Sequence, residues 1–176
     1  VEPNVVRAEK HVQMAKEATA QGMVLLKNEG HLLPLLNDTP IVALIGPHIH
    51  DRKAMAGNYL GELCPGSNFD CITSFAEGFS NATTRYGGTL LPVEGCAVSG
   101  TDISGFPKAK DAASQADVVI FMGGLDGSLE AEGKDRPDIR LPSVQSKLIQ
   151  EIAQVNANIV LVLMHGGMVG LDAVTV

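Results

Sequence analysis

The sequence predicts an α/β domain in which helices flank a mostly parallel sheet on both faces, as a three-layer sandwich. Four short apolar runs alternate along the chain with four amphipathic stretches, in the repeated order helix, strand. The apolar runs are continuous, which is typical of parallel strands buried on both faces. The length of 176 residues suits one such domain, and it is short for an α/β barrel, which usually needs more than about 200 residues.

The first helix and strand are separated by a polar turn. Residues 4–27 carry small or apolar side chains at helical spacing, and Asn28-Glu29-Gly30 is expected to end that helix. The β-branched run 41–45 stops at Gly46-Pro47, which indicates a buried strand that leads into a loop.

The middle of the chain continues this alternation. A helix is expected over 73–86 and a strand over about 89–93. Pro107 stands where a first-turn proline is favoured, and a strand is expected over 118–122. The helix between them has a face of small residues: Ala109, Ala112, Ala113 and Ala116.

The last helix and strand complete the pattern. Pro142 opens a helix, and the final strand is expected over 159–164. The buried face of that helix is predicted to be Val144, Leu148, Ile149, Ile152 and Val155. We therefore expect a linker and N-terminal helix over 1–40, followed by the sandwich domain over 41–176.

The composition excludes several classes of partner. The net charge is −7, with 13 Lys and Arg against 20 Asp and Glu, and no basic cluster points to a nucleic acid. The longest apolar run, from Ile159 to Met164, is far shorter than the roughly 20 residues that span a bilayer, so we expect no membrane partner. Neither a Gly-x-Gly-x-x-Gly motif nor a P-loop is present, which disfavours a nucleotide cofactor.

The cysteines and two possible N-glycosylation triplets indicate in which cellular compartment the protein could fold. Cys64 and Cys71 enclose a short loop that could close as a disulfide in an oxidising compartment, or they could be two inert thiols. Asn37-Asp38-Thr39 and Asn81-Ala82-Thr83 match the N-glycosylation pattern, which also arises by chance. The chain starts at Val1 and is expected to be a processed or partial sequence.

The loop 123–142 is the densest candidate site, because ligands of such sheets bind beyond the carboxyl ends of the strands. Its carboxylates include Asp126, Glu130, Glu132 and Asp135. In an extended segment, Glu130 and Glu132 would share one face about 6.6 Å apart, where like charges favour the protonated form that a general acid needs. Alternatively, Arg136 pairs with a carboxylate and shapes the loop, or the loop is simply acidic and solvated.

Histidines suggest two further alternatives. His48 and His50 could present two imidazoles to a metal ion, but no third ligand is evident, so we expect no metal site. Ser128 and His165 suggest a hydrolase triad, yet the sequence has no Gly-x-Ser-x-Gly elbow.

Two segments are specific enough to identify a family: Val24-Leu25-Leu26-Lys27-Asn28-Glu29-Gly30 and Glu130-Ala131-Glu132-Gly133-Lys134-Asp135-Arg136. Shorter matches are Leu33-Pro34-Leu35, Ile45-Gly46-Pro47, Gly57-Asn58-Tyr59, Gly95-Cys96 and Ala116-Asp117-Val118. In this order the chain resembles the C-terminal sheet domain of glycoside hydrolase family 3, especially its β-xylosidase and α-arabinofuranosidase branch.

The resemblance implies a role for this domain in a two-part active site. An N-terminal α/β barrel would supply an Asp nucleophile, and this domain would contribute the general acid/base, without a cofactor. Glu132 matches the acid/base position, with Glu130 as second choice, while Asp135 and Arg136 would bind the sugar or shape the loop. The substrate would be an oligosaccharide or aryl glycoside with a terminal β-xyloside, ahead of an arabinoside or glucoside.

If the resemblance holds, the chain is expected to be a fragment of a longer enzyme. The barrel is absent and relatives continue beyond the last residues, so the sandwich is expected to be truncated and inactive alone. The parent enzyme would be a secreted, extracellular glycoprotein of xylan degradation. The alternatives are a non-catalytic carbohydrate-binding or interaction domain, and a metal-dependent hydrolase built on His48 and His50.

Overall fold

The computed structural model describes residues 5, 8–35, 41–57, 59–61, 63–64, 66, 68–172 and 174. Contacts divide the chain into two compact units, Val1–Pro34 and Leu35–Val176. The expected division into 1–40 and 41–176 stays a prediction, because residues 36–40 lie outside the described part. No helix of the described residues is both long and apolar enough to cross a bilayer.

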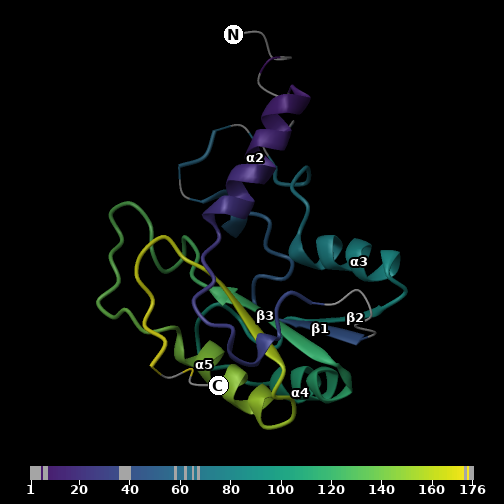
Figure 1. The fold of residues 1–176 in the computed structure, drawn as a ribbon. Coiled ribbons are helices and arrows are strands. Elements are labelled where there is room, and N and C mark those ends of the chain that lie inside the picture. Colours follow the sequence, from purple (N-terminus) through teal and green to yellow (C-terminus); the bar gives the residue numbers. More distant parts are fainter. Residues whose placement is uncertain are drawn as a thin grey trace. The chain divides into compact units, whose positions relative to one another are not determined.

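The second unit is built on a four-stranded parallel sheet (Figure 1). Its strands are β1 (Ile41–Ile45), β2 (Thr89–Val93), β3 (Val118–Gly124) and β4 (Ile159–Met164), in the order β2-β1-β3-β4. All three pairings are parallel, which confirms the predicted sheet. Every residue of β3 is buried, as expected of a central strand covered on both faces.

Helices cover both faces of this sheet (Figure 1), with α3 (Phe75–Arg85) on one side and α4 (Phe106–Gln115) and α5 (Ser143–Ala153) on the other. A capping box starts α3: the Glu77 carboxylate accepts a hydrogen bond from the Ser74 backbone N–H at 2.7 Å, and the Ser74 hydroxyl accepts one from the Glu77 N–H. The three predicted helices of this unit are confirmed, and α3 lies within two residues of its expected bounds at each end.

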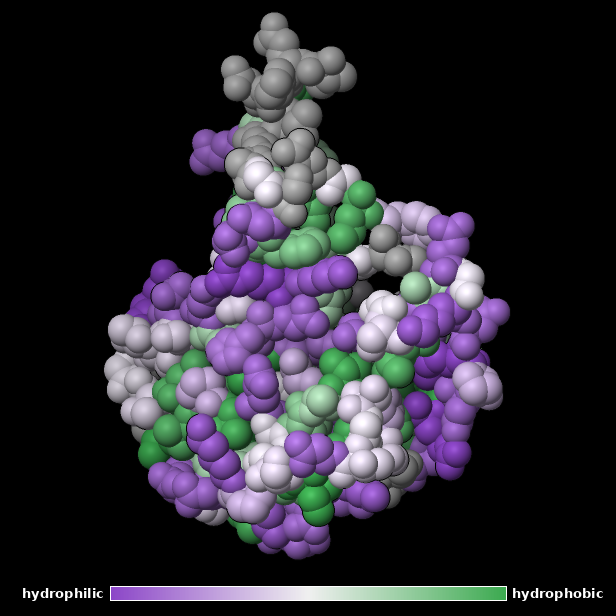
Figure 2. Space-filling view, turned by 180° about the vertical axis from the view of Figure 1, so that it is seen from behind, coloured by the Kyte–Doolittle hydropathy of each residue, from purple (hydrophilic) through white to green (hydrophobic). Residues whose placement is uncertain are grey.

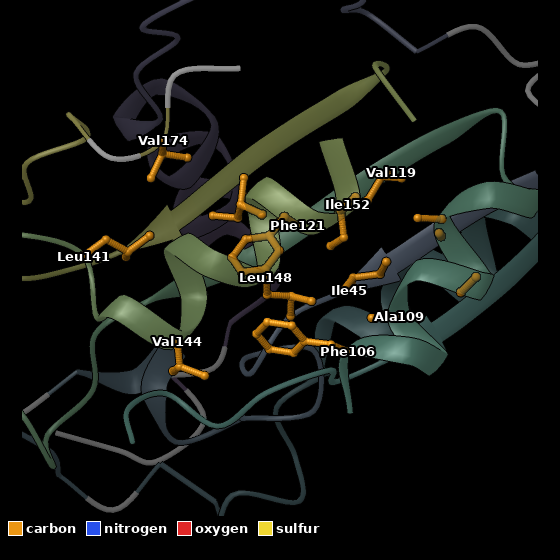
Figure 3. Close-up of a cluster of buried hydrophobic side chains, with 14 residues drawn as sticks. Ile45, Phe106, Ala109, Val119, Phe121, Leu141, Val144, Leu148, Ile152 and Val174 are labelled. Carbon is orange, nitrogen blue, oxygen red and sulfur yellow. The ribbon is translucent and has the colours of Figure 1, made fainter. Parts of the chain in front are cut away.

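The main core lies between the sheet and the helices α4 and α5 (Figure 3). Alternate residues of the central strands, such as Ile45 and Phe121, point into it and are fully buried. Figure 3 shows Leu148 of α5 between Phe121 and Phe106. Ala109 has no side chain beyond Cβ, so α4 packs close to the strands, as the small-residue face predicted.

On the face shown in Figure 2, hydrophilic residues are interspersed with apolar ones.

Two predicted helix ends were wrong. The helix α5 ends at Ala153, so Val155 is 41% exposed instead of buried. In the first unit, α2 (Glu9–Gly22) is shorter than the expected helix over 4–27, and residues 4, 6 and 7 of that prediction lie outside the described residues. Asn28 does not end the helix; its side-chain amide instead bonds both the N–H and the carbonyl of Leu33.

A disulfide joins Cys64 and Cys71, whose Cα atoms are 5.6 Å apart. We expect the double variant Cys64→Ser/Cys71→Ser to have a free energy of unfolding lower by about 2–3 kcal/mol, because the bond restricts the unfolded chain over a short loop. Urea unfolding of the parent and the variant measures this difference. A variant as stable as the parent would show that the bond does not restrict the unfolded ensemble.

Candidate active site

The carboxyl ends of β1 and β3 meet at the switch point of the sheet, where chain connections leave in opposite directions. Ligand sites of open α/β sheets lie in the crevice at such a point. The loop after β1 approaches β3 closely: the His48 backbone N–H donates to the Met122 carbonyl at 3.2 Å. The acidic loop 125–142 therefore begins at the edge where a ligand site is expected.

Asp126 shapes the first turn of this loop. Its carboxylate accepts hydrogen bonds from the backbone N–H and the hydroxyl of Ser128, at 2.9 and 2.5 Å. Its backbone carbonyl accepts from the N–H groups of Leu129 and Glu130, both at 3.1 Å. These contacts close a compact turn, and they engage the Asp126 carboxylate within the loop.

Glu132 lies in a tight turn that follows. The backbone groups of Ala131 and Lys134 exchange two hydrogen bonds, of 3.2 and 2.9 Å, around Glu132 and Gly133. Gly133 has φ +70°, which a turn of this kind requires and glycine adopts without strain. The Lys134 ammonium donates to the Ser128 carbonyl and joins the two turns. The segment is therefore not extended, so the condition under which Glu130 and Glu132 would share one face is not met.

The Glu132 side chain is exposed, and within the described part of the chain it forms no hydrogen bond or ion pair. The same holds for Asp135. By contrast, Asp138 is bound by Arg140, which lowers the pKa of the Asp138 carboxyl to about 2. The Glu132 carboxylate is therefore exposed to solvent in this turn, and the exposed Asp135 follows three residues later.

Glu130 and Arg136 anchor the loop. Arg136 Nε donates to Glu130 Oε2 at 2.8 Å, and Nη2 donates to the Met168 carbonyl at 2.5 Å. The Glu130 carboxylate rests against the backbone of Gly167, where a Cβ would lie 2.8 Å from both of its oxygens. A bridge between Arg140 and Gly170 extends the contact, and Figure 1 shows the two segments running side by side. The predicted pairing of Arg136 with a carboxylate is confirmed.

Gln145 is a positioning residue that the sequence analysis missed. Its fully buried amide accepts from the Gly124 N–H at 2.9 Å and donates to the carbonyls of Gly124 and Val98, at 2.8 and 2.7 Å. These bonds fix the last residue of β3, from which the acidic loop departs. The sequence did contain a signal for this residue: a glutamine lies between Val144 and Leu148 on the apolar face of the helix, where a buried polar side chain needs hydrogen-bond partners.

The metal-site alternative is contradicted. His48 is fully buried and His50 is exposed, so the two imidazoles do not face one ion. Across the residues that the structure describes, no three His, Cys, Asp or Glu side chains are grouped to hold a metal.

The triad alternative fails as well. The Ser128 hydroxyl donates to Asp126, while His165 Nδ1 lies 2.6 Å from the Gly167 carbonyl oxygen. No hydrogen bond joins Ser128 and His165 in the described structure, so His165 does not act on this serine as the base of a triad.

Burial of His48 makes stability depend on pH. Desolvation lowers the pKa of this histidine, although Asp51, 3.6 Å away, and Asp126 act in the opposite direction. Below its unfolded pKa near 6.5, the unfolded chain binds a proton that the folded chain does not, so the free energy of unfolding should decrease as pH falls. We expect His48→Gln to have a shallower decrease between about pH 7 and 5 in urea unfolding. Equal slopes for parent and variant would contradict this assignment.

A cavity of about 780 Å³ lies away from the acidic loop, between α3, β2 and the segments around His50 and Cys71. None of the four predicted site residues lines it: Glu130, Glu132, Asp135 and Arg136. The candidate active site is therefore an exposed loop, and a second surface would be needed to enclose a substrate on it.

Known proteins resemble this chain over most of its length. Residues 23–175 match the family model of the glycosyl hydrolase family 3 C-terminal domain. The chain is 40% identical over 168 residues to Beta-D-xylosidase 1 of Arabidopsis thaliana, an alignment that covers 94% of this chain and 20% of that protein.

Solved structures agree with this match. A GH3 exo-beta-xylosidase (XlnD) in complex with a xylobiose aziridine activity-based probe superposes with a TM-score of 0.81 at 34% identity, covering 93% of this chain and 20% of the other. The GH3 beta-glucosidase of Bifidobacterium adolescentis gives a TM-score of 0.75 at 29% identity, covering 97% and 24%. The chain spans a fifth to a quarter of the length of these relatives. It belongs to glycosyl hydrolase family 3, as the C-terminal domain of that family.

Proposed function

We propose that this chain contributes the general acid/base to a retaining, exo-acting β-glycosidase that releases terminal β-linked xylose from oligosaccharides or aryl glycosides. Family membership and the named β-xylosidases among the relatives support this assignment. Retaining hydrolysis needs two carboxyl groups about 5–5.5 Å apart, one as nucleophile and one as acid/base. We assign the nucleophile to an N-terminal α/β barrel of the full-length protein and the acid/base to Glu132.

The observation that carries the assignment is the position of Glu132 in the turn 131–134. The carboxylate is exposed, forms no hydrogen bond or ion pair with a described residue and belongs to a loop whose base is fixed by Glu130 and Arg136. Such a group can approach a substrate held by another domain without first breaking an interaction. Glu130 is less suited to this role, because its carboxylate already bonds Arg136 and lies against Gly167.

In the proposed reaction, Glu132 acts once as an acid and once as a base. As the barrel carboxylate attacks the anomeric carbon, Glu132 donates its proton to the departing glycosidic oxygen, and the bond between that oxygen and the sugar breaks. In the second step, the ionised Glu132 accepts a proton from the water that attacks the glycosyl-enzyme. The sugar leaves with its original anomeric configuration, and both carboxyl groups return to their starting states.

Arg136 is proposed to position the loop and to have no role in proton transfer. We expect Arg136→Met to lower kcat of the full-length protein by about 10- to 100-fold, since small displacements of a catalytic group have effects of this size. Arg136→Lys should recover only part of the loss, because an ammonium cannot reach Glu130 and Met168 together. Steady-state kinetics with an aryl β-xyloside measures both changes. Parental kcat in the Met variant would remove Arg136 from the proposal.

The division of the site between two domains has a direct experimental test. The full-length protein should hydrolyse an aryl β-xyloside, whereas the 176-residue chain alone should show no turnover. Turnover by the isolated chain that disappears in Glu132→Gln would contradict the split site.

The Cys64–Cys71 disulfide supports an extracellular location for the parent enzyme, because such bonds persist in oxidising compartments.

A further inference from the structure

Asn81 stands on α3 in the triplet Asn81-Ala82-Thr83. Its side chain is exposed, and among the described residues its amide has no hydrogen-bond partner. The Thr83 hydroxyl donates to the carbonyls of Phe79 and Ser80 one turn earlier, so it packs along the helix and does not cover the Asn81 amide. The acceptor nitrogen is therefore free on the surface of the folded protein.

The space beside Asn81 is open, and both polar and apolar residues line it. Asn81 lines the cavity of about 780 Å³ together with Glu77 and Ser80 of the same helix face, and with Arg52 from the loop after β1. Arg52 is paired with the Glu77 carboxylate and donates to the Asp70 carbonyl at 3.0 Å, while the Asp70 carboxylate accepts a hydrogen bond from the Asn68 amide, so each of these charged groups already has a partner. A neutral group rich in hydroxyls could occupy this space without separating an ion pair or desolvating a free charge.

A second observation on the same wall indicates the compartment. Cys71 lines the cavity and is bonded to Cys64. Disulfides of this kind form in the secretory pathway, which is also where asparagine side chains receive oligosaccharides. The acceptor triplet and the disulfide are two separate features that both fit the secretory pathway. This reasoning does not depend on the acid/base assignment of Glu132.

We infer that Asn81 is a site of N-linked glycosylation. In this transfer, Asn81 Nδ2 forms a bond to the anomeric carbon of a lipid-diphosphate-linked oligosaccharide, and the bond from that carbon to the diphosphate oxygen breaks. The amide nitrogen loses one proton, and the lipid diphosphate is the leaving group. The glycan would occupy the wall formed by α3 and β2, so this cavity holds an attached sugar and not a substrate.

The test uses the full-length protein secreted from a eukaryotic host. Trypsin releases the peptide 54–85, in which Asn81 is the single acceptor. We expect this peptide to carry a glycan, and amidase treatment should convert Asn81 to Asp and increase gel mobility. Asn81→Gln and Thr83→Ala should abolish the modification, while Thr83→Ser, which retains the acceptor triplet, should keep it.

Asn37→Gln is the matched control, since it removes the other triplet and should leave the peptide 54–85 modified. An unmodified Asn81 in secreted protein with an intact Cys64–Cys71 bond would overturn the inference. An unmodified Asn81 in protein that keeps both cysteines reduced would overturn it too. The parental peptide answers the question even if a variant fails to accumulate.

Discussion

Glu132→Gln is expected to lower kcat/KM of the full-length protein by about 10²- to 10⁴-fold for an aryl β-xyloside with a poor leaving group. The amide has nearly the same shape as the carboxylic acid but cannot donate a proton to the departing oxygen. A strongly acidic phenol leaves without protonation, so the same variant should lose much less activity on an activated substrate. Kinetics over a series of phenols of graded acidity measures this contrast.

Two variants in the same loop serve as controls. Asp135→Asn removes the other unpaired carboxylate, and Glu130→Gln removes the partner of Arg136. Neither should make the rate depend more steeply on the leaving group, although Glu130→Gln should reduce kcat for all phenols alike. Unchanged kinetics in Glu132→Gln would instead favour the alternative of a non-catalytic carbohydrate-binding domain.

Gly124→Ala is expected to lower the free energy of unfolding by about 3–5 kcal/mol. Gly124 ends β3 with φ +123°, a conformation that a residue with a Cβ adopts only under strain. A Cβ there would also lie 2.8 Å from the backbone carbonyl carbon of Met164 in the neighbouring strand, which cannot rotate aside as a side chain would. Urea unfolding followed by far-ultraviolet circular dichroism measures the loss.

Gly127→Ala is the matched control for this substitution. Gly127 lies three residues further along the same loop, has an ordinary φ, and a Cβ there would have no neighbour within 4 Å. Its free energy of unfolding should stay within about 1 kcal/mol of the parent. If the two variants lost equal stability, the close approach of β3 and β4 would not be the cause.

Most of the fold was predictable because its determinants are local. Short apolar runs bounded by turn residues located all four strands, and Pro107 and Pro142 placed the starts of two helices. Helix ends were harder, since the apolar pattern continues at Val155 although the helix has stopped. The pattern records which residues are apolar, but the final turn depends on packing against the rest of the domain.

The candidate site was predictable only in part. The density of carboxylates located the loop, and Gly133 was a turn signal that the extended interpretation overlooked. The contact of Arg136 with Met168 joins residues 32 positions apart, and the bonds of Gln145 to Gly124 and Val98 span 21 and 47. Such contacts depend on the order of strands in the sheet, which local spacing does not specify.

Chemical rescue tests the role of Glu132 most directly. Glu132→Ala in the full-length protein, supplied with an activated aryl β-xyloside, should form the glycosyl-enzyme and then stall, because no base activates water. Added azide should enter the vacated space, restore turnover and yield the β-configured xylosyl azide, whereas Glu130→Ala should give no azide product. Hydrolysis by Glu132→Ala at the parental rate, or azide product from Glu130→Ala alone, would contradict the assignment.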